Sequence, residues 1–193
     1  MDEKPEIIIN DIVFTEPTTF LTDLLVAVLC IIFAIKLFDG QKASARQNFR
    51  VLFFLMTGIS ALAGGIYHLL SLYLGENLAY SSWIVSSLGV FMLEMWSLSF
   101  LQNKRRLIFL SITASGLFVG SFAAILIMKS FLPVVLRSAA GVFAIVVPAR
   151  LQTKNDMPDF IFKNFFYAIG FSILSAIAYI PVLSIHKWFN NAD

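Results

Sequence analysis

Charged residues are scarce in this chain: Asp, Glu, Lys and Arg together make up 13% of its 193 residues, whereas 59% are hydrophobic. A soluble domain carries roughly 25% charged residues. The deficit favours an integral membrane protein over a soluble one, with membrane lipids as its surroundings. The formal net charge of +2 is too small to predict nucleic-acid binding.

Motifs that would identify a reaction are also missing. The single cysteine, Cys30, excludes an intramolecular disulfide. The sequence contains no nucleotide-binding loop, no nucleophile elbow and no ligand set for haem or an iron–sulfur cluster. Function must therefore be inferred from isolated polar residues within apolar stretches.

Six apolar stretches reach the length of about 20 residues that a spanning helix needs. They are 18–38, 50–74, 79–101, 106–128, 131–151 and 158–185. Lys129 and Ser130 alone separate the fourth from the fifth, and Pro133 supports a break there because proline is tolerated in a first helical turn. Ile7–Phe14 is too short to cross and is interpreted as a surface or interfacial piece. The sequence predicts an all-α transmembrane bundle of six spans, with seven as the alternative, in a single membrane domain, 1–193.

Basic residues alternate between the connections. The first, third and fifth connections with their flanks are basic, whereas the second has no Lys or Arg and the fourth has Lys129 alone. The basic residues are Lys36, Lys42, Arg46, Arg50, Lys104, Arg105, Arg106, Arg150, Lys154 and Lys163. Because basic loops stay in the cytoplasm, both termini are expected outside, in a bacterial cytoplasmic membrane.

Four ionisable residues, Asp23, His68, Glu94 and Arg137, lie inside the apolar stretches. Such residues are costly in hydrocarbon and usually face a partner or a wet cavity, so they are our candidates for a ligand-binding site. Helical rise places Asp23, His68 and Arg137 in the outer half, with Tyr67 and Tyr179 at related depth. Glu94 should lie deeper, past the midplane, and pair with Arg137 only if the helices tilt or a water bridges them.

Each of these residues also has a purely structural interpretation. Asp23 could cap the outer end of its helix, His68 could bond a backbone carbonyl, and Glu94 with Arg137 could form a structural ion pair. His68 shares a helix face with Ala61, Gly64 and Gly65, which predicts that it points into the bundle.

Small residues recur every four positions in the fourth stretch, at Gly116, Gly120 and Ala124. Small residues let helices approach closely in lipid. The pattern predicts tight packing within the chain, with homodimerisation through Gly116 and Gly120 as the alternative.

Two segments resemble a known family. Thr15–Asp23 resembles the glutamate-containing opening of the alkaline ceramidase group and its small bacterial relatives, and Ser60–His68 resembles the small-residue run that ends in an aromatic–histidine pair. The resemblance implies an intramembrane zinc, with His68 as its first ligand and Glu16 as the nearby acid, and hydrolysis of an amide or ester in a lipid. The late histidine pair has no counterpart in Phe160–Phe166. Because a zinc site needs at least three protein ligands, the missing pair disfavours zinc.

Three functions follow as hypotheses. The first is binding of a lipid or small ligand by a ceramidase-like relative without a complete zinc site; if the chain is an enzyme, the resemblance implies a lipid amide or ester hydrolase. The second is a small-solute or proton transporter or channel that uses Glu94 and Arg137. The third is an assembly partner of another membrane protein.

Overall fold

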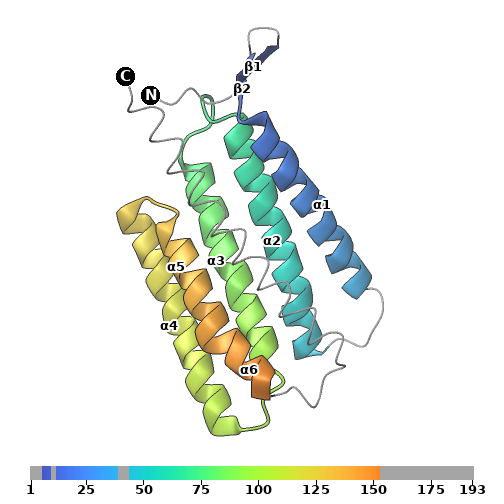
Figure 1. Cartoon of the computed structure of the whole chain (residues 1–193), viewed down its shortest axis with the longest axis vertical. Coiled ribbons are helices and arrows are strands. Elements are labelled where there is room, and N and C mark those ends of the chain that lie inside the picture. Colours follow the sequence, from blue (N-terminus) through green and yellow to red (C-terminus); the bar gives the residue numbers. More distant parts are fainter. Residues whose placement is uncertain (1–5, 10–11, 39–43, 153–193) are drawn as a thin grey trace, which may run out of the picture. The chain divides into compact units, whose positions relative to one another are not determined.

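The computed structural model describes residues 6–9, 12–38 and 44–152 (Figure 1). The chain divides into two compact units, Lys4–Ala149 and a second that combines Met1–Glu3 with Arg150–Asp193. The sites described below lie in the unit Lys4–Ala149. The apolar stretch 158–185, which includes Tyr179, lies outside the described residues, so the sixth span and the single domain stay predictions.

Helices dominate the described chain. The elements are α1 (Pro17–Phe38), α2 (Ala45–Leu69), α3 (Asn77–Leu98), α4 (Lys104–Met128), α5 (Leu132–Gly141), the π-helix η1 (Val142–Val146) and α6 (Val147–Gln152). The last three form one continuous run, Leu132–Gln152. This run and α1 to α4 give five helices that are long and apolar enough to cross a membrane. The helical class is confirmed, together with five of the predicted stretches as apolar helices of spanning length.

The boundaries of α2 differ most from the prediction of 50–74. The helix begins earlier because Ser44 is its N-cap, and the Ser44 hydroxyl accepts a hydrogen bond of 3.2 Å from the backbone N–H of Gln47. It ends at Leu69, because Leu70 leaves the helical conformation. The expected break between α4 and α5 is confirmed at Lys129, which has a left-handed backbone with φ of 47°.

The N-terminal segment forms a hairpin. Strands β1 (Glu6–Ile9) and β2 (Ile12–Thr15) pair antiparallel, with Glu6 opposite Thr15. The hairpin is tied to the turn after α2, because the backbone N–H of Val13 donates to the hydroxyl of Tyr73 over 2.9 Å. The short piece expected at the surface is therefore a β-hairpin at one end of the helices (Figure 1).

Neighbouring helices pack in sequence order: α1 against α2, α2 against α3, and α3 with α4 and α5. Two glycines of α2 allow α1 to approach. A Cβ added to Gly58 would lie 3.2 Å from the carbonyl oxygen of Ala27, and one added to Gly65 would lie 2.9 Å from Cβ of Asp23. Small residues of α2 thus allow close packing against α1.

Pro148 gives a physical reason for the π-helix. Its ring has no N–H and collides with the carbonyl four residues earlier, at Ala144, in a regular α-helix. Ala144 lies in η1, where the wider turn relieves this collision without ending the helix. The helix therefore continues through Pro148 by a local widening.

Candidate functional site

Glu94 of α3 and Arg137 of α5 form a buried ion pair with two parallel hydrogen bonds. Arg137 Nη1 donates to Glu94 Oε1 over 3.0 Å, and Nη2 donates to Oε2 over 2.8 Å. The Glu94 side chain is 0% exposed and the Arg137 side chain is 2% exposed. A two-point guanidinium–carboxylate contact is among the stronger polar interactions, and it offsets part of the cost of burying both charges.

The pair depends on Gly141, one helical turn after Arg137. A Cβ at this position would collide with Oε1 of Glu94, and it would lie 3.2 Å from Arg137 Nη1. The Arg137 side chain therefore extends along α5 to the level of Gly141, where it meets Glu94. The ion pair considered for these two residues is thus formed by direct contact, and the length of the arginine side chain, which a count of backbone rise ignores, spans the difference in depth.

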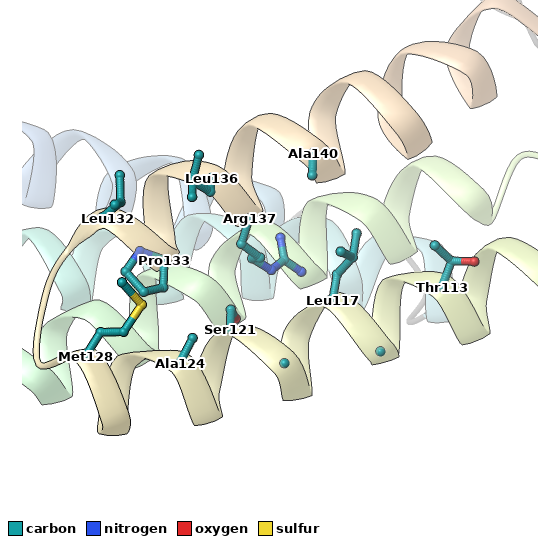
Figure 2. A pocket seen from close by; sticks show the side chains of 12 residues that line it. Thr113, Leu117, Ser121, Ala124, Met128, Leu132, Pro133, Leu136, Arg137 and Ala140 are labelled. Carbon is teal, nitrogen blue, oxygen red and sulfur yellow. The ribbon is translucent and has the colours of Figure 1, made fainter.

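A groove of about 480 Å³ runs between α4 and α5 beside this pair (Figure 2). Its lining is mostly apolar or small: Thr113, Gly116, Leu117, Gly120, Ser121, Ala124, Met128, Leu132, Pro133, Leu136, Arg137 and Ala140. A Cβ added to Gly116 or Gly120 would have nothing within 4 Å. The described residues therefore contain no close packing partner for these two glycines, and tight packing at Gly116 and Gly120 stays a prediction.

The groove has a polar floor. Ser121 is buried, and its hydroxyl lies 2.8 Å from the hydroxyl of Ser87 on α3. Figure 2 shows Arg137 reaching from α5 toward α4, between Ser121 and Leu117. Arg137 Nε is buried without a hydrogen-bond acceptor in the described part of the chain. Among the described residues, the guanidinium is thus bound by the Glu94 carboxylate, whose negative charge balances its positive charge.

A second polar cluster lies at the junction of β2, α1 and α2. His68 Nδ1 and Glu16 Oε2 are 2.8 Å apart, and Asp23 is close enough for His68 to act on it electrostatically. Thr15 donates to the carbonyl oxygen of His68 over 2.5 Å and lies 2.8 Å from the hydroxyl of Ser71. The His68 side chain, which was predicted to point into the bundle, contacts Glu16 and is 38% exposed, because α2 ends at the next residue.

The predicted outer-half site is therefore divided. Asp23 and His68 belong to the cluster around α1 and α2, whereas Arg137 binds Glu94 between α3 and α5. Tyr67 lies edge-on to His68, with ring centroids 6.0 Å apart. Tyr179 lies outside the described residues.

The ligands that zinc would need are not assembled within residues 6–9, 12–38 and 44–152. No three His, Cys, Asp or Glu side chains in these ranges come together as a metal-holding group. The donor set around His68 does not fit the zinc implied by the resemblance.

Sequence reasoning missed several members of these clusters. The roles of Thr15 and Ser71 required the hairpin, which no pattern indicated. Glu16 entered only through the family resemblance. Gly141 was visible only as a small residue on the face of Arg137, and its contact with Glu94 depends on the packing of α5 against α3.

Residues 18–193 match a family described as "Family of unknown function (DUF6962)". The chain belongs to this family. No curated protein and no solved structure matches it. The match includes both members of the buried ion pair and the groove of this DUF6962 protein, but the family description assigns them no activity.

Glu94→Gln should destabilise the protein strongly, because Arg137 would keep a buried charge without a counter-charge. Removal of one partner from a buried pair costs about 3–5 kcal/mol. The midpoint of thermal unfolding in detergent, followed by circular dichroism, should therefore fall. The double variant Glu94→Gln/Arg137→Met removes both charges and should recover most of the loss. The single variant Arg137→Met completes the comparison. A double variant whose loss of stability equals the sum of the losses in the two single variants would contradict a coupled pair.

Gly141→Ala should also lower the unfolding midpoint, because the new methyl group occupies the position of Glu94 Oε1. Gly116→Ala is the matched control, since the same change in another helix meets no atom of the described residues within 4 Å. Alanine raises helix propensity by about 1 kcal/mol at either site, so the control should be neutral or slightly stabilised. Similar behaviour of the two variants would contradict the contact between Gly141 and Glu94.

Proposed function

We propose that this protein is an integral membrane protein that binds a membrane lipid, with one acyl chain of the lipid in the groove between α4 and α5. The observation that carries the proposal is the open glycine face of α4. Gly116 and Gly120 line the groove, yet nothing among the described residues lies where their side chains would be. Small residues usually allow another chain to approach closely.

The dimensions of the groove suit an elongated apolar ligand. Its volume of about 480 Å³ is within the range of roughly 300–1,000 Å³ for small-molecule sites. Thr113 and Met128, at its two ends on α4, are about 22 Å apart along the helix at about 1.5 Å per residue. That length is more than half of the hydrocarbon core, which is about 30 Å thick.

The charge balance of the floor favours an uncharged occupant. Arg137 lines the groove, but its charge is met by both carboxylate oxygens of Glu94. An acyl chain can lie against this neutral pair without displacing a counter-ion. An anionic group at this depth would have to compete with Glu94 for the guanidinium and would leave one carboxylate unpaired, which is costly in hydrocarbon.

The membrane orientation follows from the basic residues. Arg46 at the start of α2 and Lys104–Arg106 at the start of α4 lie at one end of these helices, because Arg46 donates to the carbonyl oxygen of Ser99 in the α3–α4 connection. We propose that this end is cytoplasmic and that both termini are outside, in a bacterial cytoplasmic membrane. The groove then begins in the outer half of the bilayer, at the α4–α5 turn.

Two other hypotheses use the same residues. A homodimer or an assembly partner would place a helix, rather than a lipid, against Gly116 and Gly120. A transporter or channel would need the Glu94–Arg137 pair to open, and in liposomes its flux should disappear in Glu94→Gln. The open glycine face supports a lipid or a helix more directly than it supports a solute pathway.

Filling the groove tests the proposal. Gly120→Leu should reduce retention of co-purified lipid, measured by native mass spectrometry after mild detergent extraction. Overpacking costs about 1–3 kcal/mol, which corresponds to a loss of affinity between about fivefold and 150-fold. Ala123→Leu is the matched control, because Ala123 is an exposed residue of α4 that does not line the groove.

Each outcome decides between the hypotheses. Loss of lipid in Gly120→Leu but not in Ala123→Leu supports an acyl-chain groove. Gly120→Leu could instead leave lipid retention unchanged and convert an oligomer to a monomer, or remove a co-purifying membrane protein. Either result would show that this face of α4 binds a helix rather than an acyl chain. Unchanged lipid retention without either effect would contradict both.

A further inference from the structure

A second hollow, of about 440 Å³, lies where α2, α3 and α4 meet at the end opposite the N-terminal hairpin. It is lined by Phe49, Met95, Ser99, Leu107, Ile108, Ser111 and Ile112, and we refer to it as the basic-end hollow. Most of its lining is apolar. Exposed cations of α2 and α4 lie beside it.

Arg46 is fixed at this hollow by two contacts. Its Nη2 donates to the carbonyl oxygen of Ser99 over 2.9 Å, and its guanidinium carbon lies 4.1 Å from the centre of the Phe100 ring. Ser99 itself lines the hollow. Arg46 is exposed, and its other N–H groups have no acceptor within the described ranges. A cation with free donors is thus held at the edge of an apolar cavity.

The first turn of α4 adds cations on the same side. Lys104 precedes Leu107, Ile108 and Ser111 by three, four and seven positions, so it shares their helix face. Arg105 stands in the same relation to Ile108 and Ile112. Both side chains are exposed. The hollow is therefore flanked by Arg46 on α2 and by two cations on α4.

No acidic side chain balances these cations in the described part of this end. The first turns of α2 and α4 contain no Asp or Glu, and the nearest acid on α3, Glu94, is buried against Arg137. The linking residues 39–43 contribute one Asp and one Lys and lie outside the described residues. The cations of α4 also oppose the helix dipole, which favours negative charge at a helix start. Their position costs stability unless an anion compensates it.

We propose that the basic-end hollow binds an anionic phospholipid of the inner leaflet, with its phosphate against Arg46, Lys104 and Arg105 and one acyl chain in the cavity. Charge complementarity and the adjoining apolar hollow identify this occupant. The proposal rests on the membrane placement proposed above, but it does not depend on a lipid in the α4–α5 groove.

The test compares binding of phosphatidylglycerol and phosphatidylcholine to the full chain by native mass spectrometry. Wild type should prefer phosphatidylglycerol. Lys104→Gln/Arg105→Gln should reduce that preference between about fivefold and 30-fold, taking about fivefold for each cation near an anionic surface. Lys129→Gln is the control, because Lys129 is an exposed cation at the other end of α4 and should leave the preference unchanged.

Thermal stability gives a second readout, because the effect of the double variant on the unfolding temperature should differ between neutral and anionic vesicles. In vesicles of pure phosphatidylcholine, Lys104→Gln/Arg105→Gln should unfold at the same temperature as wild type or higher, because two cations no longer oppose the helix dipole. In vesicles with equal amounts of phosphatidylglycerol, it should unfold at a lower temperature than wild type. A decrease of equal size in both vesicles would overturn the proposal and assign these cations a structural role.

Two further variants separate this site from its alternatives. Ser111→Leu fills the basic-end hollow and should weaken phosphatidylglycerol binding, whereas Gly120→Leu in the groove should leave it unchanged. Loss of binding in Gly120→Leu but not in Ser111→Leu would overturn the assignment to this hollow. Inorganic phosphate added to phosphatidylcholine vesicles should not stabilise wild type; stabilisation as large as that by phosphatidylglycerol would replace the lipid with a soluble anion.

Discussion

The buried contact between Glu94 and Arg137 constrains the described structure more than any other interaction. It fixes α5 against α3 with two hydrogen bonds and leaves no room for a side chain at Gly141. The same guanidinium lies on the floor of the groove toward α4. Because removing either partner would strand a charge in an apolar environment, the two helices cannot shift independently without a large cost. The pair therefore fixes the position of α5, which forms one wall of the groove.

Helices in lipid gain little from burying apolar surface, so close backbone contact and polar interactions must hold them together. The contact of α1 with α2 uses the first means, through Gly58 and Gly65. The contact of α3 with α5 uses the second. Against this background, the glycines of α4 are the exception, because no described residue occupies the space beside them. Gly65 contacts another helix, whereas Gly116 and Gly120 have no such contact among the described residues. This contrast, rather than the spacing of the glycines, supports a binding role for α4.

Hydropathy predicted five of the helices because a spanning length of apolar residues has few alternatives. It missed the ends of α2, where capping by Ser44 and the departure at Leu70 decide the boundary. The position of His68 was counted from the predicted end of α2, so His68 was expected further inside the helix than it lies. Composition also identified Glu94 and Arg137 as residues that need partners, but it could not show that they are each other's partners. That pairing depends on helix packing and on the reach of a long side chain, neither of which a linear pattern contains.

The two hollows on α4 require separate occupants. A third hollow, lined by Ser111, Ile112, Ser115, Gly116 and Val119, shares residues with both and makes the apolar surface of α4 continuous. A lipid anchored at Lys104 nevertheless has a limited reach, because one leaflet provides about half of a core that is about 30 Å thick. Gly120 is about 24 Å from Lys104 along the helix. In the proposed orientation, an inner-leaflet acyl chain therefore ends before the centre of the groove, so the lipid that we propose for the groove beside Arg137 belongs to the outer leaflet.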